Sequence, residues 1–336
     1  MKTVFIINPC AGCGKNTEAL ICNIKSASQS ADADVEIYIT KSPGDATSYI
    51  RDFCNKYGSA RFIACGGDGT LSEVVNGVIG FEGCQVGVLP IGTGNDFCRN
   101  FKSDTNFENI TLLLQGDTVK CDAIKYTTCI DGIKKSGYCA NMFNIGFDCN
   151  VADMTAEMKK KPFISGSLAY LISVFAMLIR KKGASLKIEL DGKETHNGRL
   201  LLTSIANGSY CGGGFKSNPL ASLKDGLINI NIVKNISRLR FLTLLPCYMK
   251  GTFLEVRGID KIISSLKCKK IVVTPLSGKM RLCSDGEIID AGRTEFEIVP
   301  QAFEFVVPGV KVLQHIMINN NLNIIITTKQ KSCKAD

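Results

Sequence analysis

Five consecutive residues, Gly66-Gly67-Asp68-Gly69-Thr70, combine an anion-binding turn with one carboxylate. Arg61–Cys65 before them is an apolar run of strand length, and one helical face follows, formed by Leu71, Val74, Val75 and Val78. The glycines let a ligand approach the backbone, and the N–H groups that open a helix attract anions. Asp68 would repel a bare phosphate, so it predicts a metal ion or ordered water between them. The alternative is an ordinary glycine-rich turn.

The first third of the chain alternates strands and helices, which predicts an α/β domain with a doubly wound parallel sheet. The T-x-x-E spacing of Thr70 and Glu73 is typical of a capping box, so we expect the helix after the glycine-rich turn to begin at Thr70. Ligands bind beyond the C-terminal ends of such strands. The expected strands are 2–7, 35–40, 61–65 and 84–89, the other helices are 17–27 and 46–57, and the loops at that edge are 8–14, 40–45, 66–70 and 91–96.

Two familiar nucleotide-binding patterns are excluded. Pro9 stands where a Walker A motif needs its first glycine, and Asn16 follows Gly14-Lys15 where Ser or Thr is required. No G-x-G-x-x-G follows the first strand, so a dinucleotide-binding fingerprint is also missing. With only 2 His and one close Cys pair, Cys10-x-x-Cys13, a Cys/His metal cluster is not indicated, and the 16 cysteines are expected to be reduced.

From about Asp117 the pattern becomes β-rich, with two helical interruptions at 163–180 and 237–249. Phe163–Ile179 is the most apolar stretch, but it is shorter than the ~20 residues of a membrane span and contains serines, so we expect a packed helix. Its basic flanks would also suit contact with an anionic bilayer. The expected strands are 119–128, 138–147, 186–190, 199–206, 270–274, 279–283, 294–299 and 302–307, with hairpin turns at 131–132 and 191–192.

Several motifs in this order resemble those of the diacylglycerol kinase catalytic family, specifically its soluble bacterial lipid kinases, over about residues 2–307. They are Asn8-Pro9 with Gly12, Gly66–Thr70, Gly92-Thr93-Gly94-Asn95-Asp96, Asn207-Gly208, Gly212-Gly213-Gly214, Pro219-Leu220-Ala221, Asp225-Gly226 and Asp285-Gly286-Glu287. The resemblance implies a doubly wound nucleotide-binding α/β domain plus a β-sandwich domain, with the active site in the cleft between them. The expected boundaries are 1–122 with the returning segment 300–312, then 123–299, and a tail at 313–336.

The resemblance also implies which residues bind ATP. The corresponding positions are Asn8, Pro9, Cys10, Ala11, Gly12, Thr40, Gly66, Gly67, Asp68, Gly69, Thr70, Leu71, Ser72, Glu73 and Thr93, with Asn95 and Asp96 lining the same cleft.

A structural Mg²⁺ is implied at Asp225, with backbone carbonyls from Ser222 and Leu227, because a hard cation prefers oxygen ligands. Asn229 departs from the pattern, since many relatives have a second Asp there. An ordinary Asp-Gly turn is the alternative.

Phosphoryl transfer needs positioning, charge neutralisation and a carboxylate that takes the hydroxyl proton. The resemblance gives this role to Glu287, with Asp285 as the competing candidate, and the sequence does not decide between them. A plain hairpin turn at Asp285-Gly286 is the alternative.

The resulting expectation is a cytoplasmic, ATP- and Mg²⁺-dependent lipid kinase that converts diacylglycerol to phosphatidate. A sphingoid base or another glycerolipid remains open as the acceptor. The net charge of +9 suits peripheral contact with the anionic inner face of a membrane, and no nucleic-acid partner is expected. A homodimer stays open. The alternatives are an NAD kinase-like or sugar kinase-like enzyme and, in another class, a nucleotide-sensing or lipid-binding protein without catalysis.

Overall fold

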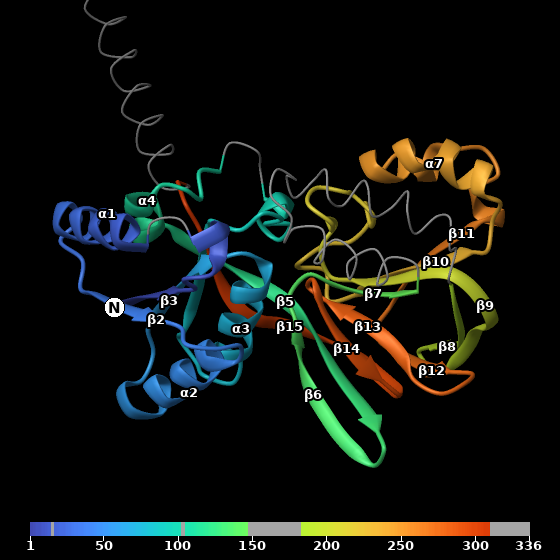
Figure 1. The fold of residues 1–336 in the computed structure, drawn as a ribbon, viewed down its shortest axis with the longest axis horizontal. Helices are drawn as coiled ribbons and strands as arrows, with labels where there is room; N and C mark the ends of the chain where they lie inside the picture. The colour runs from blue at the N-terminus through green and yellow to red at the C-terminus, as the bar shows by residue number, and fades with distance from the viewer. Residues whose placement is uncertain (15–16, 102–104, 147–182, 310–336) are drawn as a thin grey trace, which may run out of the picture.

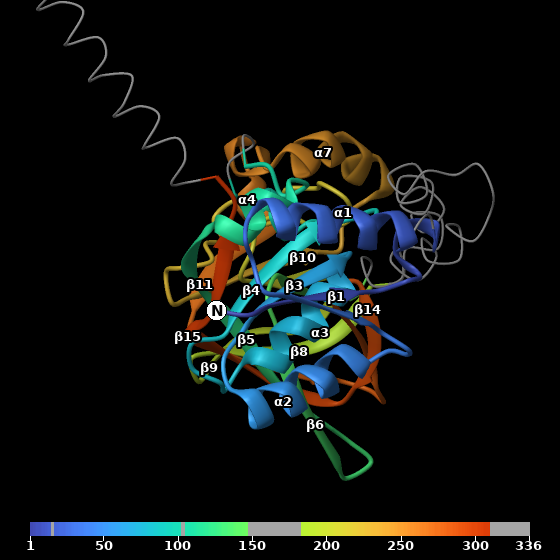
Figure 2. The same cartoon turned by 90° about the vertical axis from the view of Figure 1, so that its left-hand side faces the viewer.

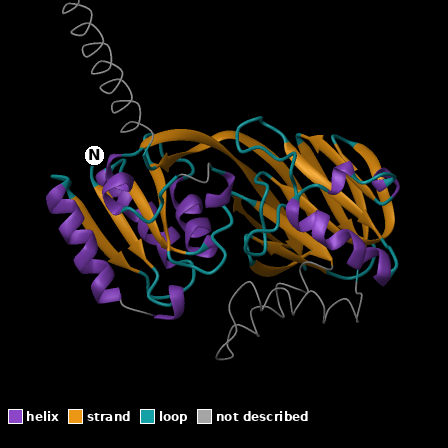
Figure 3. Cartoon of the chain, turned by 90° about the horizontal axis from the view of Figure 1, so that it is seen from above, coloured by secondary structure: helices purple, strands orange, loops and turns teal. Residues whose placement is uncertain are grey.

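The computed structural model describes residues 1–14, 17–101, 105–146 and 183–309, so the expected helix at 163–180 and the tail beyond 312 lie outside it. The chain forms two lobes side by side, joined by long strands (Figures 1 and 3). No helix in the described ranges is both long enough and apolar enough to cross a membrane.

The first lobe is a doubly wound parallel sheet, as predicted. Its strand order is β2-β1-β3-β4, with the end of β15 added beside β4. Two helices, α1 and α4, cover one face, and α2 and α3 cover the other (Figures 1 and 2). Every residue of β1 is buried, as expected for a strand covered on both sides. The elements are β1 Thr3–Ile7, η1 Ala11–Gly14, α1 Thr17–Ser30, β2 Val35–Ile39, α2 Asp45–Tyr57, β3 Arg61–Gly66, α3 Asp68–Val78, β4 Gln85–Pro90, η2 Cys98–Asn100 and α4 Ile110–Gln115.

Helix α3 begins at Asp68, two residues before the predicted start, and the predicted capping box is wrong. The N-cap residue is Gly67, which has no side chain that could cap the helix. The Glu73 carboxylate instead accepts the backbone N–H groups of Gly44, at 2.9 Å, and Ala46, at 3.1 Å, at the start of α2. Because α3 packs beside α2, Glu73 satisfies donors of the neighbouring helix rather than of its own.

The second lobe is a β-sandwich, as predicted, around an apolar core that includes Phe143, Ile230 and Phe296. A second apolar cluster lies under α7, whose N-cap Ser237 accepts the N–H of Arg240. The elements are β5 Asp117–Ile130, β6 Ile133–Cys139, β7 Met142–Gly146, β8 Ala184–Leu190, β9 Lys193–Ala206, β10 Ile228–Lys234, α7 Arg238–Lys250, η3 Phe253–Glu255, η4 Ile259–Lys261, β11 Ile263–Cys268, β12 Lys270–Pro275, β13 Met280–Ser284, β14 Glu287–Ala291 and β15 Arg293–Val307.

Both predicted hairpin turns are confirmed, at 131–132 between β5 and β6 and at 191–192 between β8 and β9. The expected strand 138–147 is wrong, because it divides into β6 and β7, and β7 pairs with β9 and β13 instead of β5. Strands β10 and β11 were not predicted.

The two expected strands 294–299 and 302–307 form one strand, β15, with a register shift between Val299 and Phe303. Strand β15 pairs with β5 on both sides of this shift, and its end returns to β4 of the first lobe. Since β5 and β15 belong to both lobes, they carry the connection between them (Figure 1). The boundaries 1–122 and 123–299 stay a prediction.

Candidate active site

The loops that follow β1, β2, β3 and β4 lie together at one edge of the parallel sheet. Asn8 Nδ2 donates to Thr70 Oγ1 at 3.1 Å, and the Thr40 N–H donates to the carbonyl of Ile7, at 2.9 Å. The Ile91 N–H donates to the carbonyl of Gly66 at 3.1 Å. Hydrogen bonds therefore link the loops that the parallel-sheet rule predicted to meet.

Most glycines of these loops serve close packing rather than ligand access. A Cβ on Gly66 would overlap the side chain of Thr70, and a Cβ on Gly92 would lie 2.9 Å from the backbone nitrogen of Gly67. Gly69 differs, because its Cβ would point to the other lobe, 3.3 Å from Glu287 Oε1. Our expectation that the glycines open the turn to a ligand is corrected at Gly66, which packing against Thr70 requires, whereas Gly69 faces across to the second lobe.

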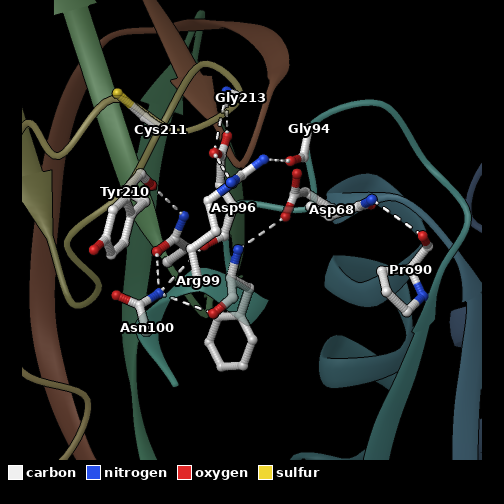
Figure 4. Close-up of polar contacts among 12 residues, drawn as sticks. Asp68, Pro90, Gly94, Asp96, Arg99, Asn100, Tyr210, Cys211 and Gly213 are labelled. Atoms are coloured by element: carbon white, nitrogen blue, oxygen red, sulfur yellow. Dashed lines mark hydrogen bonds and ion pairs between the residues drawn. The ribbon is translucent and has the colours of Figure 1, made fainter. Parts of the chain in front are cut away.

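Asp68 lies in the first turn of α3, and its Oδ1 accepts the N–H of Phe97 at 3.2 Å. Burial raises the pKa of its carboxyl. A Cβ on Gly94 would lie 2.9 Å from Asp68 Oδ2 and 3.6 Å from Asp96 Oδ2, so the two carboxylates face the same small space (Figure 4).

Asp96 is 7% exposed and contacts the second lobe. Its two oxygens accept the N–H of Gly213 at 2.9 and 3.1 Å, and Arg99 Nε lies 3.6 Å from its Oδ1 (Figure 4). Burial, followed by the charge of Asp68, raises the pKa of Asp96 to about 6. Two adjacent buried carboxylates need a proton or a cation between them, and oxygen donors of this type suit Mg²⁺.

Asp285 occupies the hairpin turn between β13 and β14, with φ 44° followed by φ 94° at Gly286. Its Oδ1 accepts the N–H of Met142 at 3.0 Å and the thiol of Cys139 at 3.2 Å, and its Oδ2 accepts the N–H of Ala140 at 3.2 Å. Burial raises the pKa of Asp285 to about 6. The hairpin-turn interpretation of this motif is confirmed, and the Asp285 carboxylate fastens the hairpin to the β6–β7 connection.

Glu287 opens β14 and is exposed, opposite the first turn of α3. Desolvation by the surrounding protein, followed by the charge of Glu73, raises the pKa of Glu287. Within the described ranges no donor hydrogen-bonds its carboxylate. Of the two candidate bases, Glu287 is the one whose oxygens accept no hydrogen bond from the described residues.

The remaining predicted nucleotide positions differ in where their side chains lie. Leu71 is buried in the hydrophobic core and Glu73 fastens α2, so neither side chain belongs to the open edge of the loops. Asn95, at φ 52°, closes its own loop by donating to the carbonyl of Gly92 at 2.8 Å, and its buried Oδ1 has no hydrogen-bond partner in the described part of the chain. The others lie on the four loops or at the start of α3, namely Pro9, Cys10, Ala11, Gly12, Ser72 and Thr93.

Asp225, where a Mg²⁺ site was predicted, has two partners within the protein. Asp225 Oδ2 lies 2.7 Å from Lys267 Nζ, and its Oδ1 accepts the N–H of Leu227 at 3.1 Å. Ser222 Oγ faces the N–H of Lys224, at 3.4 Å.

Several residues that organise the site were not predicted. Cys139 donates to Asp285, Asn100 Oδ1 accepts the N–H of Ser209 at 2.7 Å, and Asp122 binds three backbone groups between the lobes. None of them stands in a recognisable motif, because their partners lie far away in the sequence. The neighbouring motifs at Gly92–Asp96 and Asn207-Gly208 were the only available signal.

Residues 2–126 match the profile described as the diacylglycerol kinase catalytic domain, and residues 141–307 match the YegS C-terminal NAD kinase beta sandwich-like domain. The chain is 27% identical over 293 residues to diacylglycerol kinase of Bacillus subtilis strain 168, which covers 85% of this chain and 90% of that protein. It is 30% identical over 203 residues to lipid kinase YegS of Escherichia coli strain K12, covering 59% of this chain and 64% of the relative, so the match spans less than two thirds of that relative.

Two solved structures share the fold. A Bacillus anthracis strain Sterne protein assigned as a diacylglycerol kinase superposes with a TM-score of 0.68 at 25% identity, covering 91% of this chain and 95% of the other. Yeast NADH kinase in complex with NADH gives a TM-score of 0.51 at 12% identity, covering 92% and 84%, which shows a likeness of fold alone.

Proposed function

This chain belongs to the diacylglycerol kinase catalytic-domain family, and on that premise we propose that it is an ATP-dependent lipid kinase. The acceptor that we propose is the hydroxyl group of diacylglycerol, which would give phosphatidate. The support comes from two relatives, one named a lipid kinase and the other a diacylglycerol kinase. Yeast NADH kinase resembles the chain in fold alone and gives no support for NAD as the acceptor.

The observation that carries the proposal is the meeting of acidic groups from both lobes beside a helix N-terminus. Asp68 and Asp96 belong to the first lobe, and Glu287 approaches Gly69 from the second. The opening N–H groups of α3 would bind a phosphate of ATP. Asp68 and Asp96 would hold Mg²⁺, which when bound neutralises charge on the transferred phosphate.

In the proposed reaction the acceptor hydroxyl oxygen bonds to the γ-phosphorus of ATP while the bond from that phosphorus to the bridging oxygen breaks, releasing ADP. Glu287 takes the hydroxyl proton, because its carboxylate is exposed and without a donor among the described residues. Its raised pKa improves it as a base. Asp285 positions the hairpin, since its oxygens already accept from Met142, Ala140 and Cys139.

We further propose that the protein works at the inner face of a membrane, where its lipid acceptor would be found. The net charge of +9 supports attraction to an anionic surface.

A panel of acceptors with γ-labelled ATP tests the proposal. Diacylglycerol, a sphingoid base and a monoacylglycerol are offered in mixed micelles, and NAD is offered in solution. We expect labelled phosphatidate as the main product. Labelling of NAD with no lipid product would replace the lipid kinase by an NAD kinase. ATP binding without transfer to any acceptor would favour a non-catalytic binding protein.

A further inference from the structure

We propose that Lys267 supplies the cation of the loop at residues 222–227, in the place where the resemblance implied Mg²⁺. The 222–227 loop precedes β10, and Lys267 lies on the neighbouring strand β11, opposite Asn229 of β10. This contact between the loop and β11 makes the fold of the second lobe independent of a divalent metal.

The negative charge of Asp225 is already balanced by Lys267. The Lys267 ammonium and the Asp225 carboxylate are 2.7 Å apart, which is the distance of a charge-assisted hydrogen bond. The second oxygen of Asp225 accepts the N–H of Leu227. A Mg²⁺ ion at this carboxylate would either meet the ammonium at close range or have to displace it.

The side chain opposite Lys267, Asn229, adds no negative charge that would help a metal ion displace the ammonium, although its buried Oδ1 has no hydrogen-bond partner among the described residues. Asn229, which opposes Lys267 in the strand pair, is neutral and 1% exposed. Its Nδ2 donates to the carbonyl of Leu266 at 3.2 Å. One carboxylate and backbone carbonyls are a weak ligand set for a small cation that gives up its water reluctantly.

Asp122 performs the structural task that a bound metal would have in this loop. Its backbone N–H donates to the carbonyl of Leu223 at 2.7 Å, and its Oδ2 accepts the N–H of Gly226 at 2.8 Å. Its Oδ1 accepts the N–H of Gln301 at 2.8 Å, at the irregularity of β15 where the chain returns to the first lobe. The 222–227 loop is therefore fastened on both sides of Asp225 by hydrogen bonds to Asp122.

Thermal unfolding of the full chain without nucleotide tests the inference, in excess EDTA and in millimolar Mg²⁺. We expect the wild type to unfold at the same temperature in both, or to show a Mg²⁺ shift that Asp225→Asn retains in full because it arises elsewhere. A Mg²⁺ stabilisation of the wild type that Asp225→Asn abolishes would overturn the inference. The measurement needs no substrate, so its failure would leave the proposed kinase activity untouched.

Lys267→Met tests the ammonium itself, with Lys270→Met as the matched control. Lys270 also forms an exposed ion pair, 3.1 Å from Glu295, and stands on β12, the next strand along the chain. We expect Lys267→Met to lower the unfolding temperature by roughly 1–4 °C, and to cost almost nothing further when Asp225→Asn is already present. Fully additive losses from Lys267→Met and Asp225→Asn would show that the pair does not act together, and would overturn the role of Lys267.

Discussion

Asp285 and Glu287 lie two residues apart but have different surroundings. The three donors on Asp285 include the thiol of Cys139, which stays protonated because burial raises its pKa well above the usual range. Glu287 is exposed beside α3. The sequence offers two equivalent carboxylates, and the difference between them depends on Cys139, Ala140 and Met142, which are more than 140 positions away.

Asp96 should make the free energy of unfolding depend on pH. Its folded pKa is about 6, against 3.8 as the ordinary value, so between pH 4 and 6 the folded protein binds more protons than the unfolded chain. The contribution of Asp96 to the free energy of unfolding therefore falls as the pH rises through that window. Asp96→Asn should remove this pH dependence, which changes the free energy of unfolding by at most about 1.4 kcal/mol per pH unit. Denaturant unfolding at several pH values checks this, and parallel curves for the two proteins would contradict it.

Most first-lobe elements were predictable because they follow local rules, but α4 was not predicted. The alternation of strands and helices placed β1–β4 and α1–α3 to within three residues at each end. The capping box failed because Glu73 serves α2, a tertiary contact that spacing cannot show. Likewise the expected strand 138–147 ends at Cys139 because the next two residues bind Asp285 and the chain near Asn207, which are distant in sequence.

The first turn of α3 gives a prediction at Gly69. Alanine there should keep the helix, and raise its stability by about 0.5–1 kcal/mol. The added Cβ would lie 3.3 Å from Glu287 Oε1, so we expect turnover to fall although the unfolding temperature does not. Gly92→Ala is the opposite case, because its Cβ would overlap the backbone of Gly67 and should destabilise the lobe. Unchanged turnover in Gly69→Ala would argue against this approach of the lobes.

Helix α3 also sets the charge that Glu287 experiences. The charge of Glu73 raises the pKa of Glu287, so Glu73→Gln should lower it. If Glu287 is the base, activity is lost as the pH falls through its pKa, and the acid limb of the kcat/KM profile should move to lower pH in this variant. Glu82→Gln, at an exposed glutamate, is the control that should leave the limb in place. An unmoved limb in Glu73→Gln would contradict the assignment.

At the scale of the whole molecule, the paired strands β5 and β15 connect the two lobes. The hydrogen bond from the Gly213 N–H to Asp96 adds a direct contact between the lobes. The family resemblance indicated two lobes and a returning strand. It did not indicate that Lys267 neutralises Asp225, since an ion pair across β10 and β11 needs strands that the sequence did not reveal.

The net charge of +9 gives a prediction for the intact protein. Binding to anionic vesicles should weaken steeply as the salt concentration rises, because attraction between exposed charges is screened within about 8 Å at physiological ionic strength. Co-sedimentation with vesicles over a salt series measures this. Binding that does not respond to salt would indicate insertion of apolar side chains instead.

Transfer of labelled phosphate from ATP to diacylglycerol in mixed micelles, by the wild type and Glu287→Gln, is the most direct test of the proposed active site. We expect phosphatidate from the wild type and about 10²–10⁴-fold less from Glu287→Gln, with ATP binding retained. Asp290→Asn, on the same strand, should behave as the wild type. Near-normal transfer by Glu287→Gln, or none by the wild type, would contradict a kinase site between the two lobes.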